Sequence, residues 1–79
     1  MNVTVLYFGS LREQRGLAEE RIHTTATNVS ELFTELSENH RFSFQLDQLR
    51  AALNEDFCTP ETRLSENDTI ALMPPMAGG

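Results

Sequence analysis

The strongest constraint on the fold of this chain is one amphipathic segment between Asn28 and His40. Apolar residues recur there at the i, i+3, i+4 and i+7 spacing of one helical face: Val29, Leu32, Phe33 and Leu36. Asn28 precedes them as a candidate N-cap, and Glu31 three residues later completes a capping-box pattern. The segment predicts a helix of about three turns. Because its stripe is too short for a coiled coil, we expect it to lie on a sheet.

Segments before and after this helix predict the strands of that sheet. Residues 2–8 alternate with period 2 and 19–25 contain β-branched residues, so we expect these two segments to pair. Between them, Ser10 as an N-cap and Gly16 as a stop predict one or two helical turns. Residues 41–49 alternate only weakly and are expected to form a connection with room for a helical turn.

The last third of the chain predicts three more strands. Residues 50–58 form two short strands around a turn at 54–56, because Asn, Glu and Asp there tolerate tight or left-handed backbone, and we expect the first of these strands in the interior of the sheet. Pro60 blocks strand pairing in the segment that follows. A polar turn at 65–68 leads into a final strand at 69–73. The predicted class is α+β, a mixed sheet of four to five strands with one main helix packed on one face.

A sheet covered by a helix on one face leaves its other face to water or to a partner. We expect the helix to cover one set of alternating side chains: Val3, Val5, Ile70 and Leu72. The opposite set then lies on the uncovered face: Leu6, Phe8, Phe57 and Met73. An exposed apolar patch of this kind is typical of an interaction surface.

Length, charge and cysteine content narrow the functional classes. At 79 residues the chain predicts one soluble domain. The single cysteine excludes an internal disulfide, and the sequence has neither a signal-like nor a membrane-spanning apolar run, so we expect a cytoplasmic protein. A net charge of −6 without a Lys/Arg cluster argues against nucleic acid and anionic membranes and favours a basic protein groove as partner.

The polar residues predict neither a metal site nor a catalytic constellation. His23 and His40 lie on different predicted elements, with no second ligand at metal spacing. Cys58 lies in an apolar strand without a basic neighbour, which favours a buried thiol over a persulfide carrier. Three glutamates read as a solvated helix face: Glu31, Glu35 and Glu38. We therefore expect no bound cofactor and no nucleophile–base pair.

The chain finishes as PPMAGG, and we predict a flexible tail, 74–79, after a domain of residues 1–73. Pro74 and Pro75 fix φ and cannot continue a strand ladder, so they stiffen the exit. Glycine without Cβ lets a narrow channel close around the backbone and leaves the carbonyl open to attack. From Met73 onward the tail reaches roughly 20–25 Å. Judged on the tail alone, a frayed chain end is the alternative interpretation. A strand that runs directly into the tail favours a segment that is inserted into a partner protein.

Three stretches of the chain resemble the small subunits of molybdopterin synthase, which are ubiquitin-like β-grasp sulfur carriers: VLYFGSLRE, LNEDF and NDTIALMPPMAGG. Their spacing covers essentially the whole chain. The terminal Gly-Gly is shared by all such carriers, including the thiamin-pathway carrier, whereas FGSLRE after a strand and PP before MAGG favour the molybdopterin branch. Asn67 stands where this family usually has Gly, and because Asn tolerates left-handed φ we expect the turn to survive.

The resemblance implies a sulfurtransferase role, as the sulfur-donating small subunit of molybdopterin synthase. An ATP-using activating enzyme would adenylate Gly79, and a sulfur donor system would convert it to a thiocarboxylate. The loaded tail would then enter the large synthase subunit and give sulfur to a cyclic pterin precursor, forming the molybdopterin dithiolene. Two carriers would serve one product molecule, and family complexes pair two large with two small subunits, a heterotetramer.

The resemblance also implies roles for single residues. Gly79 would be the reactive residue and Gly78 the slim neighbour that permits threading. Partner contacts would be made by a set of residues around the tail exit: Phe8, Phe57, Met73, Pro74 and Pro75. Arg12 would be a polar contact beside them or an exposed charge at a helix end.

Other functions fit the same features. The chain could carry sulfur in the thiamin or another pathway, or be a ubiquitin-like modifier that forms isopeptide bonds, because partners decide what attacks the adenylate. A plain β-grasp adaptor would make no use of the tail.

Overall fold

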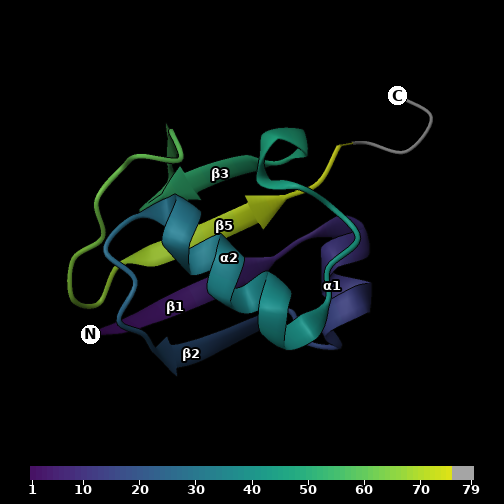
Figure 1. The fold of residues 1–79 in the computed structure, drawn as a ribbon, viewed down its shortest axis with the longest axis horizontal. Helices are drawn as coiled ribbons and strands as arrows, with labels where there is room; N and C mark the ends of the chain where they lie inside the picture. Colours follow the sequence, from purple (N-terminus) through teal and green to yellow (C-terminus); the bar gives the residue numbers. More distant parts are fainter. Residues whose placement is uncertain (76–79) are drawn as a thin grey trace.

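The sheet is built around two parallel strands from opposite ends of the chain (Figure 1). The computed structural model describes residues 1–75, and in them β1 (Asn2–Tyr7) pairs in parallel with β5 (Thr69–Met73), with Val5 opposite Ile70. Three antiparallel strands complete the sheet: β2 (Glu19–His23) beside β1, β3 (Arg50–Leu53) beside β5, and β4 (Asp56–Cys58) beside β3. The order β2-β1-β5-β3-β4 confirms the predicted mixed sheet, and it places β3 in the interior as expected.

The first helix, α1 (Gly9–Arg15), begins one residue before its predicted cap. Ser10 as the N-cap is wrong, because the residue at that position is Phe8, which has extended backbone and makes no side-chain capping bond. Strand β1 ends at Tyr7, and Gly9 with φ +55° turns the chain at once into the helix, so the serine already lies in the first turn. Gly16 ends the helix as predicted, with φ +82° and its N–H bonded to the carbonyl of Arg12.

The main helix, α2 (Val29–His40), begins where the sequence predicts. The Asn28 side chain accepts a hydrogen bond from the Glu31 amide at 2.8 Å, as an N-cap should. The Glu31 carboxylate reaches back one residue further than in a capping box, accepting from the Thr27 amide at 2.7 Å. Backbone carbonyls of Pro60 and Thr62 accept from the first amides of the helix at 2.9 and 3.1 Å, so the segment after β4 closes the helix N-terminus.

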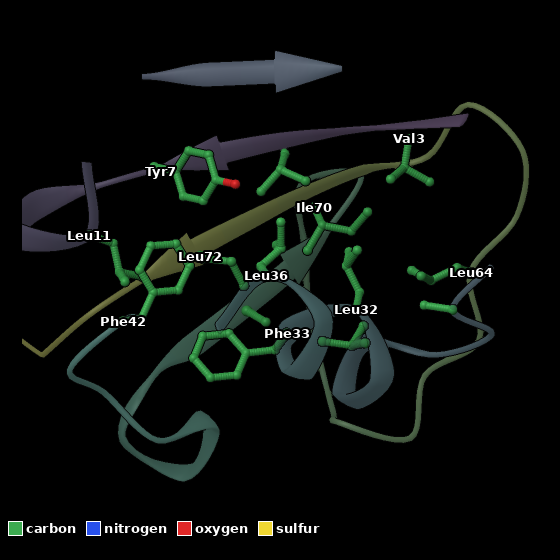
Figure 2. Packing of buried hydrophobic residues seen from close by; sticks show 14 residues of the cluster. Val3, Tyr7, Leu11, Leu32, Phe33, Leu36, Phe42, Leu64, Ile70 and Leu72 are labelled. Atoms are coloured by element: carbon green, nitrogen blue, oxygen red, sulfur yellow. The ribbon is translucent and has the colours of Figure 1, made fainter. Parts of the chain in front are cut away.

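Helix α2 lies across one face of the sheet, and the core fills the space between them (Figures 1 and 2). The side chains that were expected to meet the helix are at most 1% exposed, which confirms that assignment: Val3, Val5, Ile70 and Leu72. Phe42 adds an aromatic to this core from the segment expected to be a connection. The helical turn for which that segment had room is a 3-10 turn, η1 (Leu46–Gln48). The ring centroid of Phe42 lies 5.9 Å from that of Tyr7 and 6.1 Å from that of Phe33.

Residues with left-handed backbone conformation form two neighbouring turns, one after β3 and one before β5. Asn54 and Glu55 have φ of 50° and 76° and connect β3 to β4, so Asp56, predicted in the turn, is the first residue of β4. Asn67 has φ 68°, as expected for a residue standing in for Gly. The Asp68 carboxylate accepts from the Ser65 amide at 2.7 Å and from the Asn54 side chain at 2.9 Å, which ties the two turns together.

A partly buried polar cluster joins β1, β2 and α1. The Tyr7 hydroxyl donates to Glu20 at 2.6 Å, and Arg15 donates to the same carboxylate through two nitrogens at 2.7 and 2.8 Å. The bidentate bond to Arg15 lowers the pKa of Glu20, whereas burial, together with the bond to Glu20, raises the pKa of Tyr7. Glu20 therefore stays ionised between two donors. Within residues 1–75, no helix combines the length and the apolar character that crossing a bilayer requires.

We expect Glu20→Gln to lower the free energy of unfolding by about 1–2 kcal/mol at neutral pH, because the Arg15 guanidinium loses its carboxylate. The amide of the variant still accepts from Tyr7. Because the folded-state pKa of Glu20 lies below its ordinary value, the advantage of the wild type is full above that ordinary value. It disappears as pH falls through the folded-state pKa. Urea denaturation across this range measures it, and a difference independent of pH would contradict the assignment.

Candidate functional site

A row of side chains across four strands shapes the sheet face opposite α2. Register places Leu6 beside Ala71, Ala71 beside Ala52, and Ala52 beside Phe57. The residues on either side of Leu6 and of Ala71 point into the core, so these two side chains and their register partners, Ala52 and Phe57, point to the uncovered face. The two alanines in the middle of the row have short side chains, and the larger side chains of Leu6 and Phe57 lie on either side of them. The middle of this face is therefore lower than its sides.

A hollow opens on this face at the C-terminal end of β5. The predicted partner-contact residues that line it come from both ends of the chain and from β4: Phe8, Phe57, Met73, Pro74 and Pro75. Gly9, Ser10 and Glu13 add the side formed by α1. Phe8 is 46% exposed and Phe57 68% exposed. Two large aromatic surfaces thus remain in water beside the exit of the tail, where burial by a partner would remove them from water.

Local structure explains why both phenylalanines face outward. Phe8 follows β1 with extended backbone, so it continues the alternation that buries Tyr7 and turns Phe8 away from the core. Phe57 lies on an edge strand opposite Ala52, whose small side chain leaves the Phe57 ring uncovered.

Arg50 is a residue of the site that sequence reasoning missed. Its guanidinium carbon lies 4.6 Å from the centroid of the Phe57 ring, a cation–π distance, and it pairs in register with Met73 at the start of the tail. Among the described residues that line the hollow, Arg50 is the one cation. Period-2 alternation contained the signal, because Arg50 precedes Ala52 by two positions and so shares its face.

Arg12 lies elsewhere on α1. Its side chain is exposed and does not line the hollow with Phe8 and Met73. A polar contact from Arg12 to a partner stays a prediction.

The tail leaves the sheet from its central strand (Figure 1). On the β1 side of β5, the last backbone hydrogen bond runs from the Phe8 amide to the Leu72 carbonyl at 3.2 Å. On the other side, the first residue of β3, Arg50, pairs with Met73. Pairing with both neighbouring strands therefore ends where the prolines start. The predicted reactive residues, Gly78 and Gly79, lie outside the described residues.

The remaining candidates for chemistry stand apart from the hollow. Cys58 is partly buried, and burial raises the pKa of its thiol, which disfavours the reactive thiolate. The His40 ring packs at a tilt against Phe42, with ring centroids 5.8 Å apart, and Nδ1 of His23 lies 3.3 Å from the side-chain oxygen of Asn2. From residue 1 to residue 75, no three His, Cys, Asp or Glu side chains gather into a metal-binding group. What this geometry offers is a surface for docking beside the base of a tail.

Comparison with known proteins gives one family over nearly the whole chain. The model of the ThiS family matches residues 5–79. A chain of the complex of subunits 1 and 2 of molybdopterin-converting factor from Helicobacter pylori 26695 is 31% identical, with all of both chains covered and a TM-score of 0.70.

Two more distant structures share the fold. SAMP1 from Haloferax volcanii, a small archaeal modifier protein, is 20% identical over the full length of both chains, with a TM-score of 0.82. A chain of the BexX/CysO complex from Amycolatopsis orientalis is 21% identical over 98% of this chain and 99% of its own, with a TM-score of 0.69. The α+β architecture, a five-stranded mixed sheet with two helices, is the one these proteins have.

If the hollow is a surface rather than part of the core, its aromatic residues should add little to stability. We expect Phe57→Ala to change the free energy of unfolding by less than about 1 kcal/mol, the value of an exposed cation–π contact. Leu72→Ala, two strands away and 1% exposed, should cost about 2–5 kcal/mol. Urea denaturation of both variants measures the contrast, and equal losses would place Phe57 in the core.

Proposed function

The chain belongs to the ThiS family of β-grasp sulfur carriers, and from that premise we propose that it is the sulfur-carrying small subunit of a molybdopterin synthase. The observation that carries the proposal is the position of the apolar hollow at the base of the Gly-Gly tail. A partner that covers Phe8 and Phe57 receives the tail from the same edge of the sheet. The full-length similarity to a chain of the H. pylori molybdopterin-converting factor complex supports this branch of the family.

The first step of the proposed cycle is activation of Gly79. A carboxylate is inert until it has a good leaving group, so its oxygen attacks the α-phosphorus of ATP in a separate activating enzyme, and pyrophosphate leaves. Sulfur at the oxidation level of sulfide, delivered by a donor system, then displaces AMP from the carbonyl. A C–S bond replaces a C–O bond with no net electron transfer, and the product is a thiocarboxylate.

The second step takes place in the large synthase subunit. The thiocarboxylate sulfur attacks a carbon of the cyclic pterin precursor and displaces the oxygen bonded to that carbon, so a C–S bond replaces a C–O bond and Gly79 becomes linked to the substrate as a thioester. Water cleaves the acyl–sulfur bond, so sulfur stays on the substrate and the Gly79 carboxylate is restored. The dithiolene contains two sulfurs, so two carriers serve each product, as a heterotetramer would supply them. The chain itself binds no cofactor in this scheme.

The docking step depends on apolar contact and on charge. Phe8, Phe57 and Met73 supply the apolar centre, and a net charge of −6 favours a partner with a basic groove. Pro74 and Pro75 line the same hollow, so the partner contacts the tail base and the aromatics together. The Arg12 side chain, exposed on α1, would lie at the rim of such a contact.

We expect the wild type, incubated with ATP, an activating enzyme of this family and a sulfide donor, to gain the mass of one oxygen-to-sulfur exchange. One residue added after Gly79 should abolish the gain without changing the unfolding transition, because the reactive carboxyl is then displaced from its site. Intact-mass spectrometry measures both. A normal gain on the extended chain would contradict the mechanism, and conjugates to lysines of other proteins in place of the gain would identify a modifier.

We expect Phe8→Asp to weaken binding to the large subunit at least about tenfold, because a charge would be buried in the apolar centre of the interface. Leu17→Asp is the matched control, since Leu17 is 41% exposed, against 46% for Phe8, and does not line the hollow. It should bind as the wild type does. Titration calorimetry measures both affinities, and an unchanged affinity of Phe8→Asp would show that the partner uses another face.

A further inference from the structure

We propose that Gly9 is a positioning residue for sulfur loading, because its missing side chain forms the seat of Pro74 and so sets the direction in which the tail leaves the sheet. The expected effect on sulfur loading rests on the proposed function. The contact between Gly9 and Pro74 rests on the described residues alone. Gly9 opens α1, and Pro74 follows β5, so two segments far apart in the sequence meet at one point.

The contact between Gly9 and Pro74 is closer than a side chain at position 9 would ordinarily allow. A Cβ added to Gly9 would lie 3.0 Å from Cγ and 3.6 Å from Cδ of Pro74, where ordinary van der Waals contacts begin at about 3.5 Å. Gly9 also has φ +55°, which L-residues rarely adopt. The proline ring thus occupies the place where a side chain would begin.

The ring of Pro74 cannot easily move away from an intruding methyl group. Leu72, two residues before Pro74, is 1% exposed, and its carbonyl accepts a backbone hydrogen bond from the Phe8 amide. Met73 is paired with Arg50 on the other side. The backbone is therefore fixed on both sides up to the residue before Pro74, and the pyrrolidine ring fixes φ of Pro74 itself. A methyl at position 9 therefore requires a displacement of a few tenths of an ångström, which we expect to tilt the chain at the prolines or to open the turn at Gly9.

The direction set at Pro74 matters because the reactive end is a short way along the chain. Gly79 is five positions after Pro74, which is at most roughly 17 Å of chain. The ring of Pro75 also fixes its φ, so a tilt at Pro74 is carried into the next residue. A tail that starts in the wrong direction brings Gly79 to an active site less often, and imprecise placement of a reacting group slows its reaction.

The seat also fixes the tail relative to the docking surface. Gly9 and Pro74 both line the hollow beside Phe8. A partner held on the hollow therefore receives the tail in one direction, although the Gly9 seat itself adds no side chain to the contact. Experiments should then distinguish binding of the partner from placement of the tail. Substitutions at Phe8 should weaken binding, and substitutions at Gly9 should slow turnover.

The test compares Gly9→Ala with Gly16→Ala. Gly16 also has a left-handed φ, +82°, but no atom lies within 4 Å of its added Cβ. Both variants carry the backbone strain, and only Gly9→Ala displaces Pro74. Single-turnover thiocarboxylate formation at saturating activating enzyme should fall about tenfold or more in Gly9→Ala and stay near wild type in Gly16→Ala. The half-saturating enzyme concentration should change little in either. Equal slowing of the two variants would overturn the proposal.

A double variant tests the contact itself. Pro74→Ala removes Cγ and Cδ, the atoms that the methyl would meet. Adding it to Gly9→Ala should slow loading no further than Pro74→Ala alone does, because the collision is then gone. If the double variant instead slowed loading by the product of the two single-variant factors, Gly9 would act independently of Pro74, and the proposal would be overturned.

A measurement without any enzyme separates this inference from the proposed function. In nuclear magnetic resonance spectra, the amide signals of residues 76–79 should shift in Gly9→Ala and not in Gly16→Ala, because only the first alters the exit of the tail. A wild type that is never loaded would contradict the proposed function and leave this readout to decide the seat. Signals of 76–79 that match the wild type in both variants would exclude it.

Discussion

The parallel pairing of β1 with β5 is the interaction on which the rest of the structure depends. Val5 and Ile70 meet there with no exposed surface, and this joins the two ends of the chain at the centre of the sheet. Because parallel strands end at the same edge, the residue after β1 and the residues after β5 become neighbours. Phe8, Gly9 and Pro74 therefore meet at one point. With antiparallel pairing the tail would leave from the opposite edge, away from Phe8 and from α1.

The two faces of the sheet divide stability from recognition. Helix α2 covers only one face, and the described core lies there, extended by Phe42 from the connection after the helix. The other face carries alanines at its centre and exposed aromatics at its side, and we expect these aromatics to contribute little to folding stability. Phe8 and Phe57 could then vary with the partner at small cost in stability. The polar cluster of Tyr7, Arg15 and Glu20 fastens α1 to the edge of the sheet and so holds one wall of the hollow in place.

Periodicity and turn chemistry made most of this architecture predictable. Alternation alone assigned Val3 and Val5 to the core and Phe8 to the uncovered face, and the Asn28 cap located α2. What failed depended on tertiary structure. Ser10 was a sound local cap, but β1 ends so close to α1 that the helix had already begun. Three contacts join residues at least seven positions apart in sequence: the packing of Phe42, the contact of Arg50 with Phe57 and the contact of Pro74 with Gly9. Alternation gives the face on which Arg50 lies, but no local pattern encodes these contacts.

Separate residues for docking and for delivery have a consequence for how such a carrier serves its partners. In the proposed docking step, Arg50 and Phe57 would select a partner through charge and apolar area, and their side chains can change without altering the contact between Gly9 and Pro74. Gly9 and Pro74 are in contact within the chain itself, so they constrain each other whatever partner binds. In the proposed cycle, both the activating enzyme and the sulfur-accepting subunit receive the same terminal residue. One exit direction would then serve two different active sites. Under these proposals, the hollow would determine which protein docks, and the seat would determine how well the docked tail reacts.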